Sequence, residues 1–512
     1  MKKIILYSAL AIAAFTGCRK IETDGEKEVI IVPSGGNGGG TTGETITLKG
    51  RITSDTILRK TNTYILQGKV YVTNGAKMTV EAGTVIKGTY SGAEVAALII
   101  ARGSQIIAQG TASEPIVFTS NSPNPRSGDW GGIVLLGKAA INATYTADIA
   151  SVYPNNPNVL IGAGTFQIEG GVDNTYGEGV CGGGANPVND DNSGVLSYVR
   201  IEYAGYAFIP DKEINSLTMG AVGSGTTIDH VQVTYAKDDA YEWFGGTVNC
   251  KYLVAYRTQD DDFDTDNGYS GTVQFGLIVR DSSNADVSNS EAFESDNNAT
   301  GTTATPKTSA IFSNVTAIGP RATLANVGNS YFLAAAQIRR NSAISIFNSV
   351  FMGWPRGLLI DASTGTPTDL NIGLPTGTGE LRFKNNIIAG CGNHPSFPAW
   401  APVKYSAGTN AAAQSSDAEI LAWVNLAANG NQIITNNENV GYTRPFDYLN
   451  PDFTPFGSGS VLGQPNPIIN GYSFTDSKLA NNAFIDKTVT FRGAISPSGD
   501  LASWYKGWCV FN

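Results

Sequence analysis

Histidine is scarce in this 512-residue sequence, which contains only His230 and His394. A serine or cysteine triad needs a histidine beside its nucleophile, so the sequence argues against that kind of catalysis. Cysteine is also scarce, with five residues and no CxxC or CxxH spacing, which argues against a zinc site. Charged residues make up only 15% and the formal net charge is −10, so nucleic acid and anionic surfaces are not expected partners.

The first residues contain no apolar run long enough to span a bilayer. The run from Ile4 to Phe15 follows two lysines and precedes Cys18, which is typical of a secretory signal and predicts a signal peptide over residues 1–17. Gly17 before Cys18 resembles the bacterial lipobox, which implies cleavage before Cys18 and lipidation on it. An ordinary cleavage site is the alternative. Residues 18–45 are polar and glycine-rich, which indicates a flexible linker to the membrane anchor.

Four cysteines remain if Cys18 carries lipid. In an exported protein an even number of cysteines suggests two disulfides, for which three pairings are possible. We predict Cys181–Cys250 and Cys391–Cys509, because each bond would hold a loop or the tail against the body.

The rest of the chain favours an elongated all-β repeat. The sequence contains 60 glycines, short runs rich in Val, Ile, Thr and Tyr, and no amphipathic helix pattern between residues 46 and 390. "YVRIEYAG" matches "HVQVTYAK" at an offset of 32, while "DDAYEWFGG", "DDDFDTDNG" and "AFESDN" align at offsets of 22 and 30. Short strands repeated in this way predict a β-solenoid over residues 46–391.

Stacking these repeats predicts columns of equivalent residues along the solenoid. Tyr241, Phe263 and Phe293 fall in one column, and the next position gives a column of acids, Glu242, Asp264 and Glu294. A third column, Asn314, Asn348 and Asn386, suits either a hydrogen-bonded amide ladder or left-handed turns, which asparagine tolerates.

Two segments do not fit the repeat. Residues 144–192 form a long insertion that should project from the solenoid, where such loops usually carry recognition. Residues 392–512 should form a cap or side layer. Ser416 and Glu419 have capping-box spacing and Gly430 ends the apolar period, so we predict one helix of about three turns there. Trp130, Trp354 and Trp400 lie outside the columns and could contact ligand or fill coil ends.

The strings "GDWGGIVLLGKAAIN", "DNSGVLSYVRIEYAG", "WFGGTVNCKYLVAYRTQDDDFDTDNGYSG", "FRGAISPSGD" and "GWCVF" resemble exported β-helix proteins of Bacteroidota, which are often lipoproteins. The resemblance spans nearly all of the expected mature chain. It implies a right-handed parallel β-helix of the pectin-lyase-like type and an outer-membrane address, on the cell surface or on the periplasmic face. The resemblance implies fold and address more firmly than activity.

The stretch "DDDFDTD" carries five acids in seven residues, Asp260 to Asp266. If Phe263 points inward, strand alternation turns Asp262 and Asp264 outward but leaves Asp261 on the inner face unless the strand begins later. Coils about 4.8 Å apart would bring the acid column into strong mutual repulsion. Carboxylates without His or Cys favour Ca²⁺, although the sequence does not match an EF-hand loop. The predicted ligands are Glu242, Asp260, Asp262, Asp264, Asp266, Glu294 and Asp296.

Other interpretations of the acidic cluster stay open. The acids could be solvated or paired with Lys237, Arg257 or Arg280. An enzyme would use Asp238, Asp239 and Asp261 as hydrolase carboxylates, or Arg257 or Lys237 as the base of a Ca²⁺-dependent polysaccharide lyase. We favour a lipid-anchored surface protein that binds a ligand such as a glycan, or assists a nutrient-uptake complex, with a Ca²⁺ site. A Ca²⁺-dependent lyase or hydrolase is the first alternative, and a structural scaffold is the second.

Overall fold

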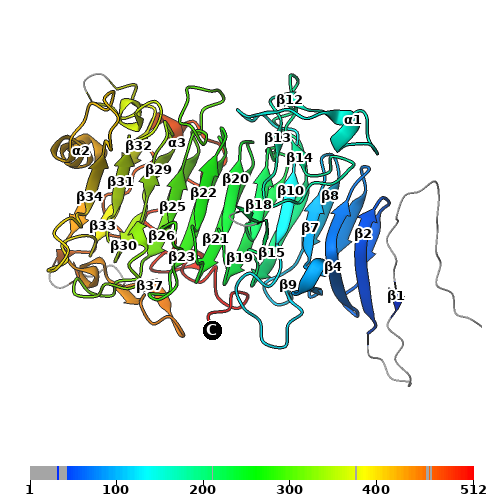
Figure 1. Ribbon diagram of the computed structural model, residues 1–512. Coiled ribbons are helices and arrows are strands. Elements are labelled where there is room, and N and C mark those ends of the chain that lie inside the picture. The colour runs from blue at the N-terminus through cyan, green and yellow to red at the C-terminus, as the bar shows by residue number, and fades with distance from the viewer. Residues whose placement is uncertain (1–31, 34–42, 210–211, 375–376, 457–459, 462–463) are drawn as a thin grey trace, which may run out of the picture.

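The computed structural model describes residues 32–33, 43–209, 212–374, 377–456, 460–461 and 464–512. The predicted signal peptide, Cys18 and most of the linker lie outside these residues. Within these residues the largest sheet has 27 strands, and each of them except the first pairs in parallel with strands of the neighbouring coils. The predicted parallel β-helix is therefore confirmed (Figure 1). None of the helices in the described ranges has the length and apolarity needed to span a bilayer.

The coils stack into walls of parallel strands. One wall carries the acidic residues and is called the acid wall below. Its strands are β7 (Ala97–Ile100), β10 (Ile133–Leu136), β18 (Leu217–Gly220), β20 (Tyr241–Phe244), β22 (Phe263–Asp266), β25 (Phe293–Ser295), β28 (Gln337–Ile338), β31 (Leu358–Asp361) and β34 (Val403–Ser406).

Five long strands bend around the opposite side of the solenoid. They are β15 (Gly194–Glu202), β19 (Thr227–Thr234), β21 (Asn249–Tyr256), β23 (Thr272–Val279) and β26 (Ile311–Ile318). Each has a left-handed residue at its middle, with φ of 50° at Tyr198, 49° at His230, 57° at Tyr252, 65° at Phe275 and 57° at Asn314. The first four rings stack along the array, with centroids 4.2, 4.4 and 5.0 Å apart. A column of left-handed residues thus makes the bend that turns one wall into the next.

The remaining ladder strands complete the ends of the solenoid. At the N-terminal end these are β1 (Val32–Pro33), β2 (Thr45–Ile52), β3 (Thr56–Leu58), β4 (Thr63–Val72), β5 (Lys77–Val80), β6 (Val85–Gly88), β8 (Gln105–Gln109) and β9 (Ile116–Ser120). At the other end they are β29 (Ser345–Phe347), β30 (Val350–Met352), β32 (Arg382–Lys384), β33 (Ile387–Ala389) and β35 (Gln432–Ile434). Because β34 and β35 still pair in parallel with β31 and β33, the ladder continues past Cys391.

Short elements decorate the coils. The helices are α1 (Ile149–Val152), α2 (Asp417–Val424) and α3 (Ser477–Ala480). The small two-stranded sheets are β11 (Thr144–Tyr145) with β12 (Gly162–Ala163), β13 (Phe166–Gln167) with β14 (Val180–Cys181), β16 (Ala207–Ile209) with β17 (Lys212–Glu213), β24 (Ser290–Glu291) with β27 (Phe332–Ala334), β36 (Tyr442–Arg444) with β37 (Asp452–Pro455), and β38 (Ser460–Val461) with β39 (Gln464–Pro465).

The capping box predicted the helix in the C-terminal part. Ser416 caps α2, and its hydroxyl oxygen accepts from the backbone N–H of Glu419 at 3.3 Å. The α-helix itself ends at Val424, and a 3-10 turn over Ala427–Asn429 leads to the left-handed Gly430. The helix is therefore shorter than the predicted three turns, although its start and the glycine stop are where the sequence placed them.

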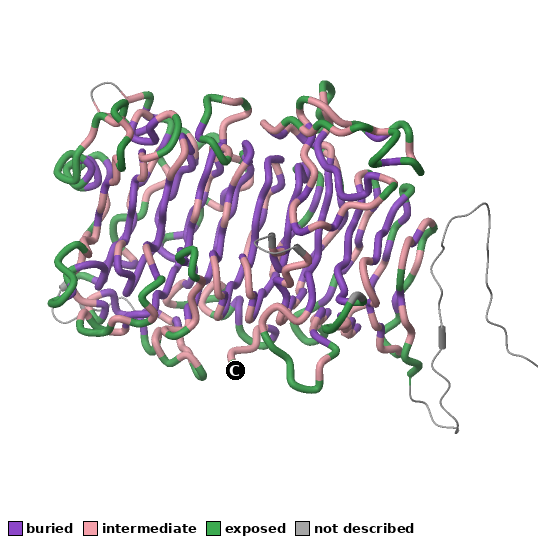
Figure 2. Tube along the Cα trace, in the orientation of Figure 1, coloured by how far each residue is buried: buried purple, intermediate pink, exposed green. Residues whose placement is uncertain are grey.

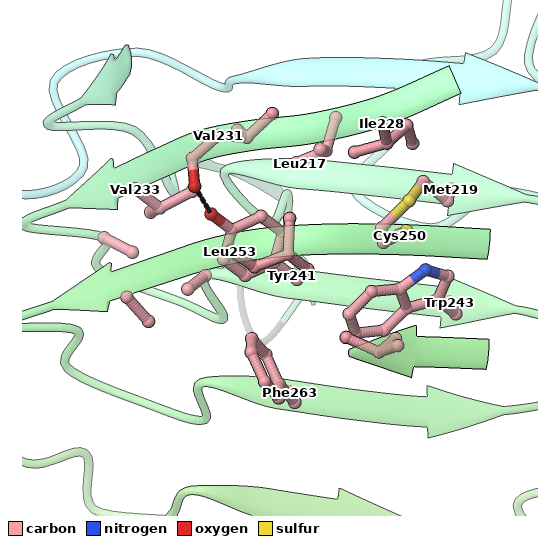
Figure 3. Close-up of a cluster of buried hydrophobic side chains, with 14 of the residues drawn as sticks. Leu217, Met219, Ile228, Val231, Val233, Tyr241, Trp243, Cys250, Leu253 and Phe263 are labelled. Atoms are coloured by element: carbon pink, nitrogen blue, oxygen red, sulfur yellow. Dashed lines mark hydrogen bonds between the residues drawn. The ribbon is translucent and has the colours of Figure 1, made fainter. Parts of the chain in front are cut away.

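The interior of the solenoid is filled by stacked apolar side chains. Figure 2 shows the strands as the buried part of the chain, and Figure 3 shows Tyr241, Trp243 and Phe263 among aliphatic neighbours. Tyr241 is fully buried and donates its hydroxyl to the carbonyl oxygen of Val231 at 2.7 Å. The register aligns Tyr241 with Phe263 and Phe263 with Phe293, so the predicted aromatic column is confirmed. Trp130 and Trp354 are also fully buried and fill the core.

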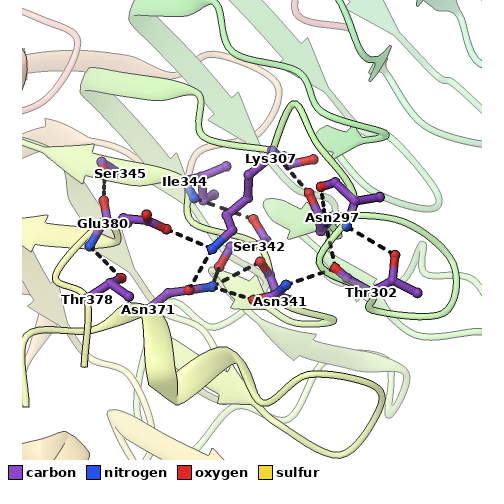
Figure 4. Close-up of polar contacts among 12 residues, drawn as sticks. Asn297, Thr302, Lys307, Asn341, Ser342, Ile344, Ser345, Asn371, Thr378 and Glu380 are labelled. Atoms are coloured by element: carbon purple, nitrogen blue, oxygen red, sulfur yellow. Dashed lines mark hydrogen bonds and ion pairs between the residues drawn. The ribbon is translucent and has the colours of Figure 1, made fainter. Parts of the chain in front are cut away.

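Asparagine side chains connect turns of successive coils most clearly at a corner that the sequence analysis did not single out. The amide of Asn371 donates to the backbone carbonyl of Asn341 at 3.0 Å, and both Asn341 and Asn297 donate to the carbonyl of Thr302 at 2.8 Å (Figure 4). In the predicted column, Asn314 instead donates to Phe491 of the C-terminal segment at 3.0 Å. Asn314 and Asn348 are left-handed, with φ of 57° and 49°, and both hold the C-terminal segment. Asn386 differs, because the left-handed residue there is Asn385, and the amide of Asn386 bonds to the preceding coil by donating to the carbonyl of Ile346 at 2.9 Å.

The C-terminal segment forms a side layer over the bent strands. Trp504, Trp508 and Phe491 pack with Tyr256 and Phe275 in a second hydrophobic cluster outside the coils. The insertion likewise packs onto the outer face of β10 through Ile168 and Cys181. Both segments thus cover the outside of the solenoid wall.

The predicted disulfides Cys181–Cys250 and Cys391–Cys509 are absent, since all four of these cysteines are free. Cys250 and Cys391 lie in the cluster inside the coils, whereas Cys181 belongs to the insertion and packs against the outer face of β10, and Cys509 packs with the C-terminal layer. The two members of each predicted pair therefore lie on opposite sides of the solenoid wall. An even cysteine count carries no information on which side a thiol faces.

Candidate metal centre

The acidic residues form two parallel columns on the outer side of the acid wall. The register pairs Glu242 with Asp264 and Asp264 with Glu294, so the predicted acid column is confirmed. A second column lies where the chain enters these strands and contains Asp239, Asp261 and Glu291.

Backbone hydrogen bonds fix the second column. One carboxylate oxygen of Asp239 accepts from the backbone N–H of Asp261 at 2.9 Å, and Asp261 accepts from the backbone N–H of Glu291 at 2.6 Å. Each carboxylate is thus held by the following coil. This arrangement repeats because the three residues occupy equivalent positions in successive coils.

Three groups of carboxylates converge closely enough to hold a metal ion. In each group, one possible ligand atom from every residue lies within 4.8 Å of the others. The groups are Asp238, Asp239 and Asp260; Asp239, Glu242 and Asp264; and Asp261, Glu291 and Glu294. Asp239 belongs to the first two groups, so these two are parts of one larger cluster.

Burial and mutual repulsion raise the pKa values of these carboxyl groups. Burial is the largest cause for Glu242, whose pKa is raised well above its usual range, with further increases from Glu169 and Asp264. Burial and the charge of Glu169 raise the pKa of Asp238 to about 8. Burial also raises the pKa of Glu291 to about 7, although a hydrogen bond with Asp261 opposes the shift. The cluster therefore needs protons or a cation near neutral pH.

Arginines neutralise only one end of the cluster. Arg339 is ion-paired with Glu294 and contacts Asp296 at 2.8 Å, and Arg340 contacts Asp296 at 2.5 Å. Within the described ranges, no lysine or arginine forms an ion pair with Asp239, Glu242 or Asp264. The uncompensated charge therefore lies at the end nearer the insertion.

The structure brings most of the predicted ligands together. Glu242, Asp260, Asp264 and Glu294 belong to the converging groups. Asp266 follows on the same strand as Asp264, and its pKa is raised to about 8 by burial and by Asp296. Asp296 is held by the two arginines rather than by the converging groups.

Asp262 is the exception, because it does not face the cluster. It is fully buried and paired with the fully buried Arg280 at 3.1 Å. Strand β22 begins only at Phe263, so the alternation used to turn Asp262 outward does not extend to it. The same boundary explains why Asp261 faces the cluster although alternation placed it inward.

Some of the residues proposed for catalysis lie in the converging groups, and others do not. Asp238, Asp239 and Asp261 lie in the converging groups. Arg257 does not, since its guanidinium contacts Asp281 at 3.6 Å and donates to the hydroxyl of Tyr235 at 2.8 Å. Lys237 lies 3.9 Å from Glu213. The structure thus places Arg257 away from the carboxylates with which a lyase would need it to act.

Sequence reasoning missed Glu291, Arg339 and Glu169. Glu291 could have been found, because it follows Asp261 at the same offset of 30 that aligns Phe263 with Phe293 and Asp264 with Glu294. Arg339 belongs to the coil after β25 and has no motif in common with the acidic repeats. Glu169 comes from the insertion, whose path a repeat alignment does not predict.

The donor set fits a hard divalent cation. All candidate ligands are carboxylates, the groups that Ca²⁺, Mg²⁺ and Mn²⁺ prefer. Two buried oxygens in the cluster, one from Asp264 and one from Glu291, have no hydrogen-bond partner in the protein. Unpaired buried oxygens are costly in an apo-protein and become satisfied when a cation is bound.

The insertion contains a cavity whose lining includes an acid that acts on the cluster. The cavity has a volume of about 380 Å³, and its lining includes Phe166, Ile168, Glu169 and Asp173. Glu169 connects the two features, because its charge raises the pKa values of both Asp238 and Glu242. The insertion thus supplies an acid whose charge acts on the site, and this acid also lines a cavity.

Comparison with known proteins gives a family but no activity. A search of curated proteins found no match. Among solved structures, the A-module of an Azotobacter vinelandii mannuronan C-5 epimerase is similar at 10% identity over 77% of this chain and 86% of that chain, with a TM-score of 0.24, too remote for a functional argument. The family model of the pectate-lyase-like β-helix domain matches residues 50–424, well over half of the sequence. The chain therefore belongs to the pectate-lyase-like β-helix domain family.

Proposed function

We propose that this protein is a cell-envelope β-helix that binds a hard divalent cation, Ca²⁺ above all, and that this cation forms part of a ligand-binding site. The observation that carries the proposal is the convergence of Asp239, Glu242 and Asp264 without a neutralising lysine or arginine among the described residues. Ca²⁺ accepts six to eight oxygens in flexible geometry, which suits carboxylates contributed by different coils.

The ligand would approach from the side of the insertion. The cavity there is lined by Phe166 and Ile168 together with Gln167 and Asp173, a mixture of apolar and polar groups that suits a polar organic molecule such as a glycan. A cation in the neighbouring cluster would leave coordination positions for oxygens of that molecule. We therefore favour a binding or accessory role.

The cellular address is the second part of the proposal. A signal peptide over residues 1–17 and lipid on Cys18 would place the β-helix on the outer membrane, at the cell surface or on its periplasmic face, where it could assist an uptake complex. The resemblance to exported lipoproteins of Bacteroidota supports this address. Metabolic labelling with palmitate should mark the wild type and fail in Cys18→Ala, and protease treatment of intact cells distinguishes the two faces.

The alternative enzyme, a Ca²⁺-dependent lyase or hydrolase, has less support. The raised pKa of Glu291 would allow it to carry a proton near neutral pH, as a general acid must. However, Arg257 is engaged elsewhere, which removes one of the two bases proposed for a lyase and leaves Lys237, which lies 3.9 Å from Glu213. Turnover of a polysaccharide by the purified protein, lost in Asp261→Asn, would favour the enzyme. A structural scaffold would show neither turnover nor cation binding.

The decisive experiment measures cation binding directly. The full chain, purified in a non-ionic detergent and freed of metal with EDTA, is titrated with Ca²⁺ and with Mg²⁺ by calorimetry. We expect Ca²⁺ to bind more tightly and to raise the unfolding temperature. Asp264→Asn should weaken binding. The matched control is Asp417→Asn, which changes the first residue of α2, an acid that pairs with Lys404. Absence of Ca²⁺ binding to the folded wild type would overturn the proposal.

A further inference from the structure

We propose that the acid wall holds two cations, one coil apart, in two sites that share no ligand. This inference rests on the proposed cation binding and adds its stoichiometry and order. The first site contains Asp239, Glu242 and Asp264, and the second contains Asp261, Glu291 and Glu294. Each site combines carboxylates from two neighbouring coils.

The two columns of acids explain why sites can repeat. Stepping from β20 to β22 moves along the column from Glu242 to Asp264, and stepping to β25 reaches Glu294. The column of Asp239, Asp261 and Glu291 advances by the same coils. Six carboxylates on three coils are thus divided into two sets of three, and the set of Asp238, Asp239 and Asp260 merges with the first site through Asp239.

A buried oxygen without a partner marks the second site as a ligand position. Glu291 is 1% exposed, and one of its carboxylate oxygens has no hydrogen-bond partner in the protein. The same residue has an oxygen within 4.8 Å of ligand atoms of Asp261 and Glu294. Such an oxygen is expensive to bury unless a proton or a cation satisfies it.

Asp264 gives the first site a related feature, although its side chain as a whole is less buried than that of Glu291. One of its oxygens is also buried without a hydrogen-bond partner. The other two ligands of the first site are positioned in advance, because Asp239 accepts from the backbone of Asp261 at 2.9 Å and Glu242 accepts from the side-chain amide of Asn215. Each site therefore combines fixed carboxylates with one whose oxygen lacks a partner.

The surroundings of the two sites differ in charge, which sets the order of binding. Arg339 is ion-paired with Glu294 in the second site, while in the described ranges no arginine or lysine contacts the three ligands of the first site. A guanidinium in contact with a ligand repels an incoming cation and competes for its oxygens. The first site should therefore fill before the second.

The experiment counts bound ions on the metal-free full chain in detergent, by equilibrium dialysis against Ca²⁺ with elemental analysis and by calorimetry. We expect two equivalents in the wild type, bound in two phases. Glu291→Gln should keep the tight equivalent and lose the weak one, Glu242→Gln should lose the tight one, and Asp417→Asn should keep both. Arg339→Gln should tighten the weak phase by roughly tenfold, the factor that corresponds to about 1.4 kcal/mol.

The outcomes separate this inference from the proposed function. A single equivalent in the wild type would overturn the second site and leave cation binding standing, whereas no binding would overturn both. Two equivalents that persist in Glu291→Gln would refute the ligand assignment. If circular dichroism shows that Glu291→Gln does not fold, Glu294→Gln makes the same test at a partly exposed ligand. The number of ions bound by the wild type tests the second site without any variant.

Discussion

Without divalent cations, raising the pH from 6 to 8 should destabilise this protein. Burial is the largest cause that raises the pKa values of Asp238, Asp266 and Glu294, each to about 8. In the unfolded chain these carboxyl groups titrate near 4. Between pH 6 and 8 the folded state therefore carries protons that the unfolded state has already lost.

The sign of the effect follows from that difference in bound protons. A group whose folded pKa is raised contributes stability that is complete below its unfolded pKa and disappears as the pH rises through its folded pKa. Each retained proton changes the free energy of unfolding by about 1.4 kcal/mol per pH unit. The three groups repel one another, so their protons leave in stages. With one net proton retained, stability falls by about 3 kcal/mol over the two pH units.

The assay is urea unfolding of the EDTA-treated full chain at pH 6, 7 and 8, followed by tryptophan fluorescence, with a parallel series in saturating Ca²⁺. The midpoint should fall with pH in EDTA. Because Ca²⁺ binds the deprotonated carboxylates, its stabilising effect should grow as the pH rises. Asp238→Asn should flatten the slope in EDTA, while Asp417→Asn should not. An equal or higher midpoint at pH 8 in EDTA would refute the reasoning.

Three further predictions concern the body of the solenoid. Arg280→Met should lower the free energy of unfolding by about 3–5 kcal/mol, because it leaves the fully buried Asp262 unpaired. In denaturant titrations, adding Asp262→Leu to the same chain should recover much of that loss. Trp243→Ala should cost about 3–5 kcal/mol, because its fully buried ring leaves a cavity, and an unchanged midpoint would contradict its place in the core. Alkylation and mass spectrometry without reductant should find the four described cysteines as free thiols. Three of them are buried and should react with the alkylating reagent only after the protein unfolds, and a disulfide-linked peptide would contradict the structure.

The sequence predicted the features of the fold that depend on the repeat. Similar residues recur at matching offsets, so the alignment predicted the columns of Tyr241 with Phe263 and of Glu242 with Asp264, and the strand register confirms both. The alignment did not predict what depends on where a strand begins. Asp262 precedes β22 by one residue, and for that reason it pairs with Arg280 inside the wall.

Other parts of the site could not be predicted because they come from segments without a repeat. Glu169 reaches the cluster from the insertion, and Arg339 reaches it from a coil whose strand β28 has only two residues. The prediction of the cysteine pairing was wrong for a related reason. Their pairing depends on which side of the wall each thiol faces, and neither their number nor their spacing reports that.

The chemistry of the acid wall follows from stacking. A parallel β-helix places equivalent residues of successive coils at strand spacing, about 4.8 Å, so an acid that is kept in each repeat must approach its own copies. Unlike charges in successive coils would relieve the repulsion, and Arg339 does this for Glu294 at one end. No arginine or lysine in the described ranges forms an ion pair with Asp239, Glu242 or Asp264, and Arg339 lowers the pKa of Asp264 only from a distance. These carboxylates must therefore keep protons at the expense of stability at higher pH, or share a cation, and the dependence of stability on both pH and Ca²⁺ distinguishes these two states.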